Sequence, residues 1–242
     1  MRLRVLEVPV PGLPPELDGL RIAHLSDFHL GVPSRGLNAT RRGVAWVASR
    51  QPDLVCITGD LLTRAAGQAE LDRLLAQVPH PYVVLGNHDF ALSRDPFSRP
   101  VEIVELTHGT LLADSEVLLD VRGCSVELLG IAPRTFLARK LFVFPDSQAD
   151  FRLLLCHFPA ALYRVEPGRF HLALAGHLHA GQIVIPYGFG RFLFAHPRVR
   201  NSQGLFIRGG TPLHVSPGLG TTFVPFRFFA RPEATELVLR SV

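Results

Sequence analysis

The alternation of short apolar runs with longer segments of helical period constrains the fold of this chain most strongly. In the first half, the runs LRIAHLS, DLVCITG and YVVLG are separated by helix-like segments near residues 37–50 and 68–78. Short apolar runs are typical of buried strands, and helical segments between such runs are typical of crossover connections in a parallel sheet. The first half therefore predicts parallel strands joined by helices.

The second half adds strands but few helices. Residues 109–131 contain three short strand-like runs separated by polar turns, and FRLLLC and FHLALA again have the pattern of buried strands. The last third is rich in Gly, Pro and Phe and ends in the strand-like ATELVLR. We find no internal repeat and no linker, so we expect a single strand-rich α/β domain over residues 1–242.

The charge of the chain is carried almost entirely by arginine. Lys and Arg number 25 against 21 Asp and Glu, which gives a net charge of +4, and only one of the 25 is a lysine. The planar guanidinium suits phosphate and carboxylate oxygens, which favours anionic partners. Genome composition is the alternative explanation of this arginine excess, and we prefer it.

Neither disulfides nor a membrane span is predicted. Cys56, Cys124 and Cys156 lie inside apolar runs without CxxC spacing, so we expect reduced, buried thiols. The first residues alternate polar and apolar as in a strand, unlike a signal peptide, and no apolar run reaches about 18 residues. We therefore expect a cytoplasmic protein, with peripheral contact to the inner face of a membrane as the alternative.

Five apolar runs are each followed at once by side chains that can ligate a metal ion. In chain order these are Asp27 and His29; Asp60; Asn87, His88 and Asp89; His157; and His177 and His179. Functional sites in open α/β sheets form beyond the carboxyl ends of strands, so these side chains are expected to converge. Carboxylate, amide and imidazole donors without thiolates suit first-row divalent ions such as Mn, Fe, Zn or Co.

The blocks DFH, GD, GNHD, a lone His and GHLH, in this order, resemble those of the calcineurin-like metallophosphoesterases. The C-terminal HVSPGLGTTFVPFRFFARPEATELVL is similar to that of a bacterial subgroup that includes membrane-associated phosphodiesterases and UDP-diacylglucosamine hydrolases. The resemblance covers nearly the whole chain. It implies a four-layer α/β/β/α sandwich, in which two mixed β-sheets are flanked by helices.

The resemblance also implies a centre of two divalent metal ions, with manganese the expected ion in vitro. The implied ligands are Asp27, His29 and His179 on one ion, Asn87, His157 and His177 on the other, and Asp60 on both. A hydroxide that bridges the ions would then attack a phosphodiester or pyrophosphate in line. His88 would act as general acid rather than as a ligand, with Asp89 beside it to orient the ring.

Several partners fit this chemistry. The expected substrate is a phosphorylated small molecule or a lipid-linked phosphate. A UDP-diacylglucosamine-type pyrophosphatase fits the aromatic C-terminal third, and a nuclease, which we rank lower, fits the basic charge. A non-enzymatic protein-binding scaffold is disfavoured because all seven implied ligands are present.

The C-terminal third alternates aromatic residues with arginines. The residues are Tyr187, Phe189, Phe192, Phe194, Phe226, Phe228 and Phe229 with Arg191, Arg198, Arg200, Arg227 and Arg231. This pattern is typical of a lipid interface or an acyl-chain site, or else of phenylalanines that fill the core of a second sheet, which we prefer. The remaining histidines are His24, His80, His108, His171, His196 and His214. We expect them to be ordinary surface or core residues. The alternative is that His196 or His214 contacts substrate.

Overall fold

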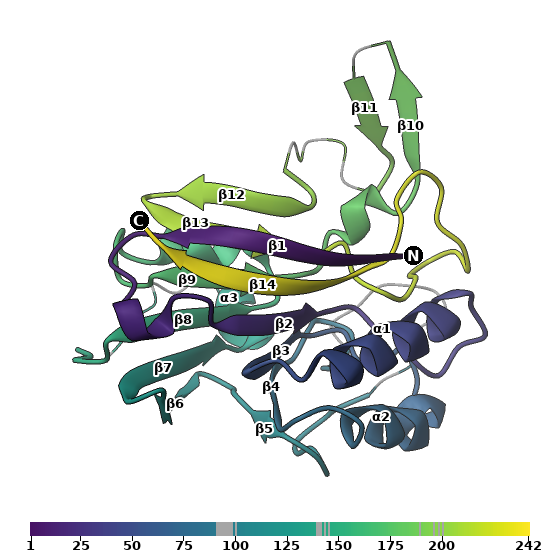
Figure 1. The fold of residues 1–242 in the computed structure, drawn as a ribbon. Helices are drawn as coiled ribbons and strands as arrows, with labels where there is room; N and C mark the ends of the chain where they lie inside the picture. Colours follow the sequence, from purple (N-terminus) through teal and green to yellow (C-terminus); the bar gives the residue numbers. More distant parts are fainter. Residues whose placement is uncertain are drawn as a thin grey trace.

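The computed structural model describes residues 1–90, 99, 101–138, 142, 144, 146–188, 190–195, 197, 199 and 201–242, and the sequence features at Phe189, His196, Arg198 and Arg200 lie outside them. Two six-stranded mixed sheets form its centre (Figure 1). The first sheet has the order β1 (Arg2–Val10), β14 (Glu233–Ser241), β2 (Arg21–Leu25), β3 (Leu54–Thr58), β4 (Pro81–Val84) and β5 (Thr110–Leu111). The second has the order β12 (Gly204–Arg208), β13 (Thr211–Val215), β9 (Leu172–Ala175), β8 (Phe151–Cys156), β7 (Cys124–Ile131) and β6 (Ser115–Val121).

The predicted strands and helices of the first half are confirmed. β2, β3 and β4 pair in parallel, and the connections between them contain α1 (Gly36–Arg50) and α2 (Gln68–Leu75). All five residues of β3 are buried, as expected for a parallel strand that is covered on both faces. The three strands expected over residues 109–131 are β5, β6 and β7.

The two sheets pack face to face across an apolar core. Ile22 and Cys56 of the first sheet and Leu128, Leu155 and Leu174 of the second are all fully buried members of this cluster. All three cysteines are buried free thiols, as predicted. Packing between the sheets therefore fixes the positions of the strand ends that carry the polar residues.

The two outer faces are covered unequally. On the first sheet, Val44 and Val47 of α1 and Leu71 and Leu74 of α2 pack over the strands and form a helical layer. On the second sheet, the cover consists of the one-turn helix α3 (Pro133–Leu137), the 3₁₀ turn η3 (Pro159–Arg164) and adjoining loops. The predicted two mixed sheets are thus observed, with a thinner fourth layer than a sandwich with full helices on both sides.

Two further features lie outside these layers. The hairpin β10 (Val184–Tyr187) and β11 (Gly190–Leu193) is a separate two-stranded sheet that projects from the body of the molecule (Figure 1). Short 3₁₀ turns complete the described structure: η1 (Pro15–Leu17), η2 (Ala65–Gly67) and η4 (His179–Gly181). Among the described helices, none is long and apolar enough to cross a membrane.

A pair of buried histidines links the sheets near the site. His24 Nδ1 of β2 lies 2.7 Å from His214 Nδ1 of β13, and His24 Nε2 lies 2.9 Å from Thr58 Oγ1. Burial lowers the pKa of both rings, well below 6.5 for His24, where His214 adds to the effect, and to about 3 for His214, where Arg4 adds to it. His24 and His214 are therefore core residues, and neither reaches the surface.

This pair predicts a loss of stability in mild acid. Both rings are neutral in the folded protein but titrate near 6.5 when unfolded, so the unfolded state binds more protons below that pH. The free energy of unfolding is expected to fall as pH drops from 6.5 towards 3, by roughly 1.4 kcal/mol per pH unit from His214, and His24 contributes a loss in the same direction below 6.5. Urea titrations across this range should show a shallower slope for His24→Asn/His214→Asn, whereas the exposed control His80→Asn keeps the parent slope. An unchanged slope in the double variant would contradict the assignment.

Candidate metal centre

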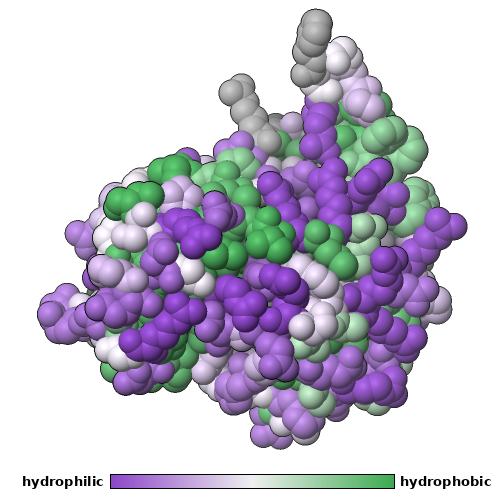
Figure 2. All heavy atoms as spheres, viewed as in Figure 1, coloured by the Kyte–Doolittle hydropathy of each residue, from purple (hydrophilic) through white to green (hydrophobic). Residues whose placement is uncertain are grey.

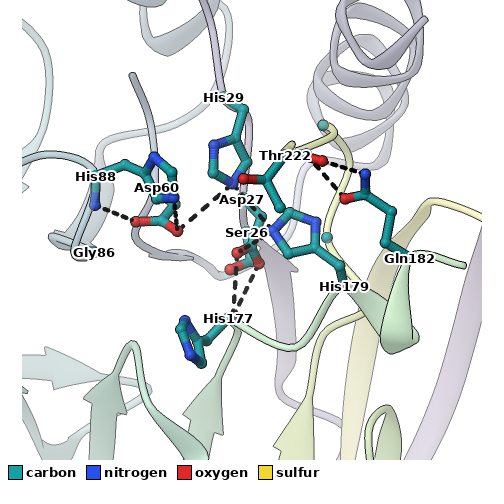
Figure 3. Close-up of polar contacts among 12 residues, drawn as sticks. Ser26, Asp27, His29, Asp60, Gly86, His88, His177, His179, Gln182 and Thr222 are labelled. Atoms are coloured by element: carbon teal, nitrogen blue, oxygen red, sulfur yellow. Dashed lines mark hydrogen bonds and ion pairs between the residues drawn. The ribbon is translucent and has the colours of Figure 1, made fainter. Parts of the chain in front are cut away.

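The polar residues that follow five strands meet at one edge of the two sheets. β2, β3 and β4 of the first sheet and β8 and β9 of the second end towards the same point, and the loops beyond them carry the predicted residues. Figure 3 shows side chains from both sheets turned towards a common centre. The structure brings together the side chains of Asp27, His29, Asp60, His157, His177 and His179, in two groups.

The first group consists of Asp27, His29, Asp60 and His179. One donor atom from each lies within 4.8 Å of the donor atoms of the others, and all four residues are buried. His29 Nε2 lies 3.1 Å from His179 Nε2 and 3.5 Å from Asp60 Oδ2, and His179 Nε2 lies 3.4 Å from Asp27 Oδ1. Four donors of this kind, facing one another without intervening protein atoms, have the composition of a divalent cation site.

The second group consists of Asp60, His157 and His177. His157 Nε2 lies 3.2 Å from Asp60 Oδ2 and 3.2 Å from His177 Nδ1. Because Asp60 belongs to both groups, its carboxylate lies between them. The contacts to His29 and His157 are both made by Oδ2, and a carboxylate oxygen has more than one lone pair, so it can serve two cations at once.

Asn87 lies beside the second group. It lines the same cavity as Asp60 and His177, and its Oδ1 is a buried atom without a hydrogen-bond partner in the described structure. A buried amide oxygen without a partner is costly, and a cation is one partner that such an oxygen takes. The donor set and this oxygen together fit a site for divalent metal.

Hydrogen bonds fix the orientation of several of these rings. His157 Nδ1 lies 2.7 Å from the carbonyl oxygen of Thr58, so Nδ1–H donates to that oxygen and Nε2 is directed towards Asp60. His29 Nδ1 lies 3.0 Å from Thr63 Oγ1. These bonds hold the Nε2 atoms of both rings towards the centre.

The carboxylates are buried at an electrostatic cost. Burial raises the pKa of Asp27 to about 6 and that of Asp89 to about 7, with the charge of Asp60 adding to both. Burial alone lowers the pKa of His157, but the charge and hydrogen bond of Asp60 raise it to about 9. A positive charge between these groups would relieve the repulsion among the carboxylates.

Five of the predicted residues have left-handed backbone conformations. The φ angles are 56° at Asp27, 49° at His29, 54° at Asp60, 74° at His177 and 47° at His179. Asp and His tolerate this region better than most residues, but each still costs free energy, and such residues cluster at functional sites. The packed strands on either side hold these turns in place.

Ala180, next to His179, shares this conformation. It has φ 53° and ψ 21°, which a glycine adopts at lower cost than an alanine. At Gly86 the constraint is space rather than backbone conformation, since a Cβ there would lie 2.0 Å from Asp60 Oδ1. The turn after β4 therefore requires glycine at this position, because any side chain would clash with the Asp60 carboxylate.

His88 lies at the wall of the cavity, next to Asp60. Its backbone N–H donates to Asp60 Oδ1 at 2.9 Å, and its Nε2 is 4.0 Å from Asp60 Oδ2 (Figure 3). Its ring meets that of His29 edge-on, with the centroids 4.6 Å apart. Thus His88 is close to the centre, yet it belongs to neither donor group.

Asp89 has a structural function in the described hydrogen bonds. Its carboxylate accepts from the backbone N–H groups of Leu61, Leu62 and Gly86, at 2.9 Å for the shortest bond to each. These bonds fasten the loop after β3, which carries Asp60, to the loop after β4. Orientation of the His88 ring by Asp89 stays a prediction.

Arg227 was not recognised in the sequence as a residue of the site. Its guanidinium donates to His179 Nδ1 at 3.0 Å and to the carbonyl oxygens of Pro217 and Gly220 at 2.6 Å. Burial lowers its pKa to about 10. The only signal in the sequence was its place among alternating Phe and Arg residues, which does not distinguish a buried arginine from an exposed one.

A cavity of about 540 Å³ opens beside the two donor groups, and most of its lining surface is apolar. Asp60, Asn87, His88, His177 and His179 form its polar floor. The apolar walls come from the ends of the hairpin and the loop after Thr222, namely Ile183, Phe194, Phe223 and Val224. The site thus combines a charged floor with apolar walls.

The preferred prediction for the C-terminal aromatic residues was wrong. Instead of filling the core of the second sheet, these side chains are largely exposed: Tyr187 61%, Phe192 43%, Phe194 66%, Phe226 46%, Phe228 49% and Phe229 62%. They lie on the projecting hairpin and on a loop near the cavity, because the core of the second sheet is already filled by aliphatic side chains.

Comparison with known proteins identifies the family. Residues 20–181 match the family model described as calcineurin-like phosphoesterase, so the chain belongs to that family, as the sequence motifs indicated. It is 28% identical to the uncharacterized metallophosphoesterase YkoQ of Bacillus subtilis over 229 residues, covering 89% of this chain and 82% of the relative.

Two further relatives carry more specific names. The UDP-2,3-diacylglucosamine pyrophosphatase LpxG of Chlamydia muridarum is 35% identical over 292 residues, covering 96% of this chain and 87% of the relative. The phosphodiesterase YaeI of Escherichia coli is 25% identical over 227 residues, covering 90% and 82%. The family and the buried Asp/His cluster together indicate a metal-binding phosphohydrolase.

The hydrogen bonds of Asp89 generate a prediction about stability. Asp89→Ala leaves the N–H groups of Leu61, Leu62 and Gly86 buried without an acceptor, so the free energy of unfolding should fall by roughly 3 kcal/mol or more. Asp89→Asn keeps one acceptor oxygen, so its free energy of unfolding should fall by less than that of Asp89→Ala. Urea titration with a chelator present measures this, with the exposed Asp146→Ala as control. Equal stabilities of Asp89→Ala and the parent would contradict the role.

Proposed function

We propose that the chain is a metal-dependent phosphohydrolase that cleaves phosphodiester or pyrophosphate bonds. The observation that carries the proposal is the pair of donor groups that share Asp60. Burying these carboxylates and imidazoles together costs free energy, and a bound cation would offset that cost. Two cation sites with a shared carboxylate are suited to the hydrolysis of phosphate esters.

The proposed metal ligands are the members of the two donor groups together with Asn87. Asp27, His29 and His179 hold one ion, Asn87, His157 and His177 hold the other, and Asp60 holds both. The mixed oxygen and imidazole donors suit Mn, Fe, Zn or Co, with Mn the ion for tests in vitro. When bound, the ions supply positive charge for the phosphoryl oxygens and lower the pKa of water.

His88 is the proposed general acid. It lines the cavity beside Asp60 without belonging to a donor group, so its ring can reach a bound ester. As a water oxygen bonds to phosphorus and the bond from phosphorus to the leaving oxygen breaks, the ring would donate its proton to the leaving oxygen. Asp60 accepts the backbone N–H of His88 and thereby fixes its distance from the centre.

The apolar walls of the cavity favour a substrate with an apolar group. Phosphate chemistry alone needs no such walls, whereas a lipid-linked phosphate would place its chain against Ile183, Phe194 and Val224. The name of the Chlamydia relative, a lipid pyrophosphatase, agrees with this choice. Nuclease activity is the second candidate, but no arginine or lysine is among the described residues that line the cavity.

The role of His88 predicts a dependence on the leaving group. His88→Ala should retain bound metal but lose about 10²- to 10⁴-fold in turnover on an alkyl phosphodiester, because the alkoxide then leaves without a proton. The loss should be much smaller for bis(p-nitrophenyl) phosphate, whose leaving group needs no proton. Kinetics on both esters, with His80→Ala as control, measure the difference. Loss of metal from His88→Ala, by elemental analysis, would show that it is a ligand.

The partner-free oxygen of Asn87 predicts a selective loss of metal. Asn87→Ala removes one ligand of the second group and leaves the first intact, so after Mn²⁺ loading the protein should retain one ion per chain rather than two. Asn87→Asp keeps an oxygen in place and should retain both. Elemental analysis of dialysed protein measures the content. Two ions in Asn87→Ala, or none in the parent, would contradict the proposed centre.

A further inference from the structure

The hairpin β10–β11 has two faces of different character. Strand pairing sets Ile185 opposite Phe192, and the next pair along the strands, Pro186 and Arg191, points to the other side of the ribbon. Ile185, Tyr187 and Phe192 are 48%, 61% and 43% exposed. One face of the ribbon is therefore an exposed apolar surface, which soluble proteins rarely leave without a function.

This apolar face continues into the wall of the catalytic cavity. Ile183 precedes Ile185 by two residues and Phe194 follows Phe192 by two, so each pair lies on one side of its strand. Ile183 and Phe194 line the cavity, their backbones are joined by a 2.9 Å hydrogen bond, and the rings of Phe192 and Phe194 meet edge-on at 6.5 Å. The surface thus runs from the tip of the ribbon to the reacting centre.

The other face of the ribbon borders a basic hollow. Near the body, Val184 and Leu193 are buried with Ala180 and Ala230, which anchors the ribbon next to the last metal ligand. Farther along the ribbon, the hollow of about 420 Å³ is lined by Arg2, Val184, Pro186, Arg191, Gln203, Phe229 and Arg231. Arginines come from β1, β11 and the loop before β14, and no acidic residue is among its described lining residues.

Aromatic and basic side chains therefore meet at one projecting element. Figure 2 shows hydrophobic and hydrophilic residues side by side where the hairpin leaves the body. An element with exposed apolar and aromatic side chains on one face and arginines on the other can present both to an anionic bilayer, which offers phosphates above its acyl chains. The guanidinium groups of Arg2, Arg191 and Arg231 need negative charge opposite them. A protein surface without a cluster of acidic residues would not supply it, whereas the phosphates of an anionic bilayer would, so the charge favours a lipid surface.

We propose that the β10–β11 hairpin, with Arg2 and Arg231 beside it, docks on an anionic phospholipid bilayer. The aromatic face enters the interface, the basic hollow takes a lipid phosphate, and the cavity mouth faces the membrane. The docking itself does not depend on hydrolysis. Its benefit, delivery of a lipid-linked substrate to the cavity, rests on the proposed function.

Co-sedimentation with vesicles tests the surface without any turnover. The parent should bind vesicles of equal parts phosphatidylcholine and phosphatidylglycerol, bind phosphatidylcholine alone much more weakly, and release as salt is raised. Arg191→Gln and Arg231→Gln should each weaken binding to the anionic vesicles roughly fivefold. Ile185→Ser/Phe192→Ser should weaken it further, whereas the controls Arg208→Gln and Leu118→Ser, exposed on β12 and β6, should match the parent.

Several outcomes would overturn the proposal. These are absence of parent binding to anionic vesicles, binding that none of the hairpin variants weakens, and self-association of the parent that Ile185→Ser/Phe192→Ser abolishes, which would assign the surface to a second copy of the chain. Turnover of bis(p-nitrophenyl) phosphate and the thermal unfolding midpoint should be unchanged in each variant, which shows that the fold is intact. Vesicle binding by a parent that hydrolyses no ester would support docking while contradicting the proposed function.

Discussion

The placement of the Asp60 carboxylate between two groups of imidazoles is the constraint on which the rest of the structure depends. It is buried, its backbone is left-handed, and it faces His29 on one side and His157 on the other. Such a cluster would not persist unless both sheets were rigid, because like charges and desolvation both oppose it. The apolar packing between the sheets and the backbone bonds of Asp89 supply that rigidity.

The cluster is also tied to the surface around it. Arg227 joins the ring of His179 to the carbonyl oxygens of Pro217 and Gly220, and the Gln182 side chain bonds to the backbone of Thr222 and Val224. The loop that forms a wall of the cavity is therefore fastened to His179 of the first donor group. In this way the apolar walls and the charged floor form one unit, although they come from distant parts of the sequence.

Much of this arrangement could be predicted from the sequence. Asp27, Asp60 and His157 each follow a buried strand, and parallel strands bring such positions to one edge, so their convergence needed no coordinates. The aromatic residues were different, because an alternating Phe and Arg pattern fits a core strand and a two-faced ribbon equally well. Which of these forms depends on whether aliphatic side chains from elsewhere already fill the core, and local sequence does not carry that information. Arg227 was missed for the same reason.

The position of β14 has a consequence for how the protein is made. It lies between β1 and β2, paired in parallel with the first strand of the chain and antiparallel to the second. Until this late segment leaves the ribosome, β2 keeps an open edge and the loop that carries Asp27 lacks its neighbour at Gly218. Sheets closed by such distant pairings form slowly. Before β14 pairs, β1 therefore has no partner in the first sheet and β2 is an edge strand, so this sheet is completed by a pairing between segments far apart in the sequence.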